Sequence, residues 1–266
     1  MNFFPSYLNP SAFRLGYVRR LKVHDVEFVF QVMIRPSEGY VLDPKTYWCG
    51  LRTYLMKVLP FIVGRSKRRF DTINIGVFED TTPKRLPRRK GSSLTPDHVN
   101  SGLTYLNGEY GGVRILLYRV EEMEKVLCHE LIHLYEAVEI NDPNFQTINL
   151  MWQKEFGVDV NLNEALTELL ATVLHNYAID KDIRDELPFS LDVCRRLRSH
   201  FSNTWKQTTH AFSYYYVKTI LLAYLLGESG DIYDLLECAS KFDKIKERSL
   251  RMTKHDVMWN KYYKIT

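Results

Sequence analysis

Two short segments restrict the fold more than any other feature of the sequence: His129-Glu130-Leu131-Ile132-His133 and the stretch from Asn163 to Glu168. Side chains four residues apart on a helix lie on one face, one turn above the other. A helix through the first segment would therefore offer both histidines to one metal ion, with the glutamate between them one step around. Glu164 in the second segment would add a third ligand. We expect both segments to be helices that pack against each other.

Zinc suits this set of side chains, because a catalytic zinc site uses three protein ligands and leaves its fourth position to water. With His129, His133 and Glu164 as ligands, the metal keeps net positive charge and acidifies that water. Glu130 would be the general base, which takes a proton as the water attacks a carbonyl group and later passes it to the leaving amine. Glu168, one turn beyond Glu164, would accept a hydrogen bond from the outward nitrogen of one histidine and orient its ring.

Each of the two predicted helices has one face that carries candidate ligands and an opposite face that is apolar. On the first, the polar face carries His129, His133, Glu122 and Glu136, and the opposite stripe consists of Met123, Leu127, Leu131, Leu134 and Val138. On the second, one face carries Glu164, Glu168, Ala171, His175 and Ala178, and the other carries Leu166, Leu169, Leu170, Val173 and Tyr177. The first helix should bury its apolar back and present its ligands, while the small alanines of the second should allow the close approach that a shared metal requires.

The order of the other predicted elements indicates an α+β fold. Hydrophobic periodicity predicts a hairpin over residues 17–22 and 26–35, a helix over 46–64 that ends at Pro60 or Gly64, a strand over 71–78 and short strands over 102–106 and 112–118. Helices are predicted over residues 120–138, 145–156, 163–178, 191–201, 210–226 and 232–239. We expect an N-terminal half (1–139) with a twisted, mainly antiparallel sheet and the histidine helix, and a helical half (140–266) that supplies the third ligand. Together the halves should form one catalytic unit.

Composition excludes several classes of protein. A chain of 266 residues that is 45% hydrophobic can bury a sizeable core. Its net charge is +4, with positive and negative residues interspersed, and this does not indicate a particular class of binding partner. The four cysteines are far apart, which excludes a zinc ribbon and favours a reducing compartment. No signal-peptide pattern and no clean apolar run of about twenty residues is present. We therefore expect a cytoplasmic protein without a membrane partner.

Both segments resemble the gluzincin clan of zinc metallopeptidases, in which H-E-x-x-H is followed by a helix bearing N-E-x-x-[ST]-[DE]. The resemblance implies a zincin-like fold, Zn²⁺ as cofactor, Glu164 as third ligand, Glu168 as the support of a histidine and a peptide or protein substrate. It also implies that the strand at 112–118 lines the cleft and pairs with extended substrate. The step from His133 to Glu164 is longer than usual in the clan, so Asn141-Asp142-Pro143 and the helix after it look like an insertion.

A looser resemblance covers about residues 70 to 225. Besides the histidine helix, it rests on Thr82 to Pro87, Val99 to Thr104, Leu117-Tyr118-Arg119 and Phe212-Ser213-Tyr214-Tyr215, which are similar to zinc metallopeptidase-like proteins encoded by large DNA viruses. That likeness implies a virion or an infected-cell cytoplasm as the setting, with capsid neighbours as partners. It names no substrate.

Peptide hydrolysis also needs a donor that stabilises the oxyanion opposite the metal. His210 and Tyr214 are the candidates, one turn apart on the helix over 210–226, and Tyr215, His200 and Tyr110 compete with them. For each of these residues, membership of an aromatic core stripe is at least as good an interpretation. His175 shares the ligand face but lies roughly 16 Å from Glu164 along the helix axis, so it should be a buried structural histidine. Cys128 should be a small side chain that packs in the protein interior.

Other interpretations remain open. The two histidines could be polar residues on a solvated helix face, and Glu164 and Glu168 could be ordinary first-turn acids on a helix capped by Asn161 or Asn163. The basic segments from Arg65 to Arg69 and from Lys84 to Lys90 could be solvated loops or a patch for nucleic acid or a capsid neighbour. Nucleic acid is the less favoured partner, because no nucleic-acid motif accompanies them. The main alternative to a peptidase is a zincin-fold structural or virion-associated protein without turnover.

Overall fold

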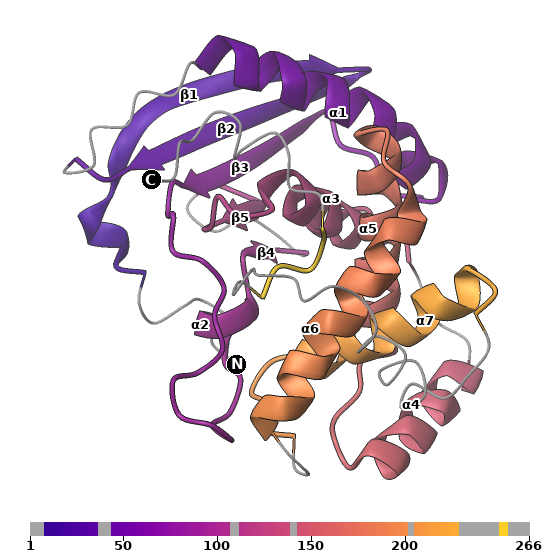
Figure 1. The fold of residues 1–266 in the computed structure, drawn as a ribbon. Coiled ribbons are helices and arrows are strands. Elements are labelled where there is room, and N and C mark those ends of the chain that lie inside the picture. The colour runs from indigo at the N-terminus through magenta and orange to yellow at the C-terminus, as the bar shows by residue number, and fades with distance from the viewer. Residues whose placement is uncertain are drawn as a thin grey trace.

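A five-stranded sheet at one end of the molecule and a group of helices at the other frame the fold (Figure 1). The computed structural model describes residues 8–36, 44–106, 112–138, 143–201, 205–228 and 250–254. Two helices, α3 (Met123–Leu134) and α5 (Leu162–Ala178), pack against each other between these two parts. The predicted helix over residues 232–239 lies outside the described residues, as do Tyr110 and Cys238.

The sheet is mixed, with the strand order β1-β2-β3-β5-β4. The antiparallel hairpin of β1 (Arg14–Val23) and β2 (Val26–Ile34) is confirmed, with β3 (Thr72–Phe78) parallel to β2. β5 (Ile115–Leu117) is parallel to β3, and β4 (Gly102–Thr104) pairs with β5 in the antiparallel sense. The prediction of a mainly antiparallel sheet is therefore wrong. One reason is that helix α1 (Pro44–Gly64) forms a crossover between β2 and β3, and a crossover brings the next strand back in the same direction.

Helix α1 (Pro44–Gly64) covers one face of the sheet. Its predicted apolar positions are buried, among them Trp48, Leu51 and Leu55. Each such side chain contributes roughly 1.5–3 kcal/mol through burial. Pro60 lies inside the helix, which continues to Gly64, so Gly64 rather than the proline marks its end.

Helix α3 is enclosed on nearly every side. Left-handed backbone at Glu122 (φ 62°) and Glu136 (φ 51°) brackets it, which makes it shorter than the predicted 120–138. All its residues except His133 are buried. The predicted burial of the apolar stripe is confirmed, but most of the polar face is covered as well, because α1, α5 and the sheet surround the helix. A buried helix must neutralise every charge that it carries.

The second half of the chain is mainly helical, as predicted. It contains α4 (Pro143–Phe156), α5, α6 (Glu186–Phe201), a π-helical turn (Ser213–Val217) and α7 (Lys218–Leu225). Short helical turns lie at Pro10–Ala12, Pro96–Val99 (α2) and Ile183–Asp185. Helix α6 begins five residues before the predicted start at 191. Among the described helices, none has both the length and the apolar character needed to cross a bilayer.

A C-terminal segment, residues 250–254, runs back into the interior. Four of its five residues are buried. Glu122 Oε1 accepts hydrogen bonds from the Met252 and Thr253 amides, the second at 2.7 Å. Glu186 accepts from the Thr253 hydroxyl at 2.7 Å and from the Lys254 amide at 2.9 Å. Two buried carboxylates therefore hold the backbone of this segment in place.

Candidate metal centre

The structure brings His129, His133 and Glu164 together from α3 and α5. His133 Nε2 lies 3.0 Å from His129 Nε2 and 3.2 Å from Glu164 Oε2. The third side of the triangle, from His129 Nε2 to Glu164 Oε2, is 3.6 Å. Among the described residues these three form a group of side chains that could hold a metal ion.

The size of this triangle fits zinc. Tetrahedral bonds of 2.0–2.1 Å place neighbouring ligand atoms about 3.3 Å apart. The three observed separations, 3.0, 3.2 and 3.6 Å, lie on either side of that value. Two imidazole nitrogens and one carboxylate oxygen are also the donor set of a catalytic rather than a closed structural zinc site, because they leave a fourth position open.

Glu168 supports one of the histidines. Its Oε2 lies 2.9 Å from His129 Nδ1, and its Oε1 accepts from the ammonium of Lys125. A proton on Nδ1 that is donated to this carboxylate leaves the lone pair on His129 Nε2, which faces Glu164 and His133. Burial alone would raise the pKa of Glu168, but Lys125 and His129 outweigh it and lower the pKa to about 2. The carboxylate therefore stays ionised and keeps the ring in this orientation.

The charges around the triangle favour a cation. Burial disfavours a charged His129 ring, yet hydrogen bonds to Glu164 and Glu168 outweigh burial and raise the pKa of His129 to about 9. Burial would likewise raise the pKa of Glu164, but the adjacent His133 and His129 hold it well below its usual value. The same negative field that attracts a proton to the rings would attract a divalent metal.

Three hydrogen bonds hold the N-terminus of α5 in place and so position Glu164. Asn161 is the cap, since its side chain accepts from the Glu164 amide at 3.2 Å. The Asn161 amide donates to Ser213 Oγ at 2.8 Å, and the Leu162 amide donates to Asn149 Oδ1 at 3.0 Å. Asn149 belongs to α4, so part of the apparent insertion after residue 142 helps to position the third ligand.

Glu130 lies against the edge strand β4. Thr104 Oγ1 donates to Glu130 Oε2 at 2.7 Å and also lies 3.0 Å from the Glu130 carbonyl oxygen. Among the described residues β4 pairs with β5 only, while β5 has a neighbour on both sides. The strand available to an extended peptide is therefore β4, and the prediction that the strand at 112–118 pairs with substrate is wrong. Thr104 has no predicted role of its own, although the segment from Val99 to Thr104 is one of those on which the looser resemblance rests.

Gly102 leaves the space that Glu130 occupies. A Cβ at this position would lie 2.6 Å from Glu130 Oε1 and 2.8 Å from Val126 Cγ1. The Gly102→Ala variant should therefore displace the Glu130 carboxylate. If Glu130 is the general base that the sequence predicts, kcat/KM for peptide hydrolysis should fall by at least about 10-fold, since small misplacements of a catalytic group cost up to about 100-fold. The capacity to bind zinc should remain, because none of the three nearest atoms that a Cβ at Gly102 would meet belongs to a candidate ligand. Steady-state kinetics with metal analysis checks both points; Gly64→Ala, whose Cβ would meet nothing within 4 Å, is the control.

The candidate oxyanion donors differ in their distance from the candidate metal centre and in their hydrogen-bond partners. The Tyr214 ring lies 5.9 Å from the His129 ring and borders the same pocket, which His210 does not line. Tyr215 donates instead to the Leu250 carbonyl at 2.7 Å, and His200 Nε2 contacts the Ser92 carbonyl at 3.2 Å. Burial and three neighbouring carboxylates raise the pKa of Tyr214 well above its usual value, so its hydroxyl keeps its proton.

Two residues outside the candidate catalytic set have the surroundings that the sequence indicated. His175 is buried, and its ring nitrogen lies 3.3 Å from the Tyr54 hydroxyl. Cys128 is fully buried next to His129, and burial raises the pKa of its thiol to about 12. A thiol held neutral in this way is a poor metal ligand.

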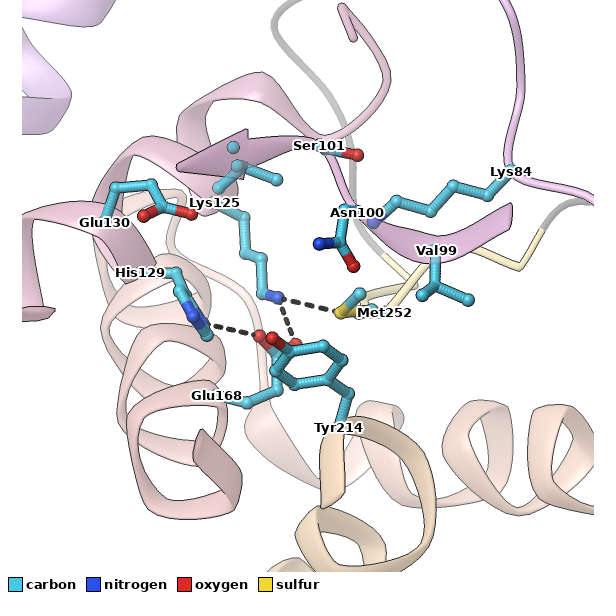
Figure 2. A pocket seen from close by; sticks show the side chains of 12 residues that line it. Lys84, Val99, Asn100, Ser101, Lys125, His129, Glu130, Glu168, Tyr214 and Met252 are labelled. Atoms are coloured by element: carbon cyan, nitrogen blue, oxygen red, sulfur yellow. Dashed lines mark hydrogen bonds and ion pairs between the residues drawn. The ribbon is translucent and has the colours of Figure 1, made fainter. Parts of the chain in front are cut away.

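A pocket of about 330 Å³, part of it open to solvent, adjoins the candidate metal centre (Figure 2). His129, Glu130, Glu168 and Tyr214 form its metal side. The remainder of its lining comes from Lys125 and Val126 of α3, from β4 and the residues before it, from the loop at Lys84 and from the C-terminal segment. The loop at Lys84 lies within the Thr82 to Pro87 segment of the looser resemblance, whereas the C-terminal segment is not among the residues that the sequence assigns to the site.

Comparison with known proteins gives one distant structural likeness. The aminopeptidase N family protein of Idiomarina loihiensis matches with a TM-score of 0.44 and 11% sequence identity, over 86% of this chain. The match spans 41% of the length of that protein. No family model and no curated protein matches the sequence. The resemblance to proteins of large DNA viruses therefore stays a prediction.

Proposed function

We propose that this protein is a zinc-dependent peptidase whose two halves form one catalytic unit. The observation that carries the proposal is the triangle of His129 Nε2, His133 Nε2 and Glu164 Oε2, with sides of 3.0 to 3.6 Å and Glu130 at the adjoining pocket. Zinc, when bound, supplies a Lewis acid that polarises a carbonyl group and activates water. The other steps belong to side chains of the chain itself.

Glu130 is the group that moves the proton. Its Oε2 is held by Thr104 Oγ1 at 2.7 Å, which leaves Oε1 to accept a proton from the attacking water and to return it to the leaving amine. Tyr214 donates its hydroxyl proton in a hydrogen bond to the substrate carbonyl oxygen, where negative charge develops. Glu168 keeps the His129 ring oriented during the reaction.

Metal analysis tests the ligand set. The purified protein should contain about one zinc per chain, and the His133→Ala variant should lose most of it, because two ligands hold zinc far less tightly than three. His24→Asn removes an exposed imidazole at a turn where φ is 50° and should leave the zinc content unchanged. Full zinc content in the His133→Ala variant would refute the ligand assignment.

Activity is tested with a peptide library in the presence and absence of a chelator. We expect cleavage that disappears with the chelator and returns when zinc is added. A zinc-loaded protein that cleaves no member of the library would favour the alternative, a structural protein with a zincin-type site.

A further inference from the structure

One part of the pocket is lined by hydrogen-bond donors. Two lysines, Lys84 and Lys125, contribute to its lining together with Asn100 and Ser101. All four residues are buried, the two lysines to within 1% of complete burial. Figure 2 shows that these side chains come from three segments: Lys125 from α3, Lys84 from the facing loop, and Asn100 and Ser101 from the residues just before β4.

Both ammonium groups retain donor capacity. An ammonium has three N–H donors. Lys84 Nζ donates to Glu122 Oε2 at 2.7 Å, while Lys125 Nζ donates to Glu168 Oε1 and lies 3.7 Å from the weakly accepting sulfur of Met252. Among the described residues, these contacts leave at least one N–H of each lysine without a strong acceptor. Glu122 does not line the pocket, and its second oxygen is occupied by backbone amides of the C-terminal segment.

Two neutral donors lie beside the lysines. Asn100 Oδ1 accepts a hydrogen bond from Thr209 Oγ1 at 3.0 Å, and the NH₂ end of the same amide does not take part in this contact. In Figure 2 that nitrogen is on the side of Lys125. Ser101 Oγ is buried and has no hydrogen-bond partner within the described ranges. A buried polar group without a partner in a native protein calls for an explanation, and a ligand is one.

We propose that this donor-rich end of the pocket binds a carboxylate of the substrate. The inference rests on the proposed function, and it names the substrate class: peptides that carry an acidic side chain or a free C-terminal carboxylate near the cleaved bond. A carboxylate has about four acceptor positions and matches a set of two ammoniums, an amide and a hydroxyl. The pocket is too small for a folded partner, so the group enters as part of an extended peptide.

Binding of matched peptides tests this proposal independently of turnover. The protein is the zinc-loaded Glu130→Gln variant, and the probes are acetylated hexaalanine peptides. In one series the C-terminus is amidated, and a single glutamate or glutamine replaces alanine at each position in turn. In the other, the unsubstituted peptide ends in a free carboxylate or in an amide. Isothermal titration calorimetry measures the affinities, and the two series separate the two sources of the carboxylate.

We expect one carboxylate peptide to bind at least about 10-fold more tightly than its amide counterpart, the size of one charge-assisted hydrogen bond. Adding Asn100→Asp should abolish this preference, because the new carboxylate still accepts from Thr209 but repels the ligand. Asn9→Asp is the matched control: it adds the same charge at an exposed cap where Asn9 Oδ1 accepts from Ser11, and the preference should survive.

Equal affinity for carboxylate and amide peptides, including no detectable binding of either, would overturn the proposal. So would a preference that persists in the Asn100→Asp variant. The proposed function fails in a different way: a carboxylate preference in binding without any cleavage by the wild-type protein refutes the peptidase but retains the pocket. Cleavage by the wild-type protein without a carboxylate preference in binding refutes the carboxylate site and retains the peptidase.

Discussion

The Glu130→Gln variant should hydrolyse peptides about 10²–10⁴-fold more slowly than the wild-type protein and retain its zinc. Glutamine has the shape of glutamate and can still accept the hydrogen bond from Thr104, but it cannot take a proton from water. The metal should remain because Glu130 is not one of the three atoms of the ligand triangle. The measurements are kcat on the best library peptide and the zinc content of the same sample.

Glu155→Gln is the matched control for this substitution. Glu155 is exposed on α4, and the same loss of one negative charge there should leave kcat within a factor of about two, as expected of surface positions away from the chemistry. Turnover above a tenth of the wild-type rate in the Glu130→Gln variant would show that another group acts as the base.

The Glu122→Ala variant should lose about 3–5 kcal/mol of stability, because it leaves the ammonium of Lys84 buried without its charged partner. Both side chains are fully buried and 2.7 Å apart. Burial alone would raise the pKa of Glu122, but Lys84 holds it below its usual value, so the carboxylate stays ionised. Its contribution is present above the unfolded-state pKa and is lost only as the pH falls through the lower folded-state pKa. Thermal unfolding near neutral pH should shift by on the order of 10 °C.

An exposed ion pair provides the comparison. Arg20 and Glu27 are separated by a similar distance, 2.8 Å, but their side chains are 64% and 40% exposed. Glu27→Ala should therefore cost no more than about 1 kcal/mol. Similar losses in the two variants would mean that Glu122 does not stabilise the fold by pairing with Lys84 and holding residues 250–254.

Local periodicity was enough to predict the elements that carry the candidate ligands. The sequence predicts the hairpin from alternating or continuous apolar residues around a turn, and it predicts α1, α3, α4 and α5 from apolar residues spaced three and four apart. Strand direction was not predictable in this way. The pattern of β3 and β5 is that of any buried strand, and only the crossover connections make them parallel.

The surroundings of the candidate site were predictable to a smaller extent. Its ligand residues stand out because histidine and glutamate at fixed spacing are uncommon, whereas Thr104 and Met252 are ordinary residues whose role depends on distant contacts. Lys84 is the clearest case. It begins a basic run whose commonest interpretation is a solvated loop, yet it is completely buried, because Glu122 offers it a partner that is remote in sequence.

The contribution of Met252 to the pocket has a consequence for how the protein is made. Ribosomes deliver the chain from its first residue onward, so the histidines and Glu164 leave the exit tunnel well before residue 252 does. Until that residue emerges, Glu122 and Glu186 lack the backbone that they hold, and one wall of the pocket is missing. A chain synthesised only as far as Glu164 would therefore contain all three candidate ligands while it still lacked the part of the pocket wall that Met252 supplies.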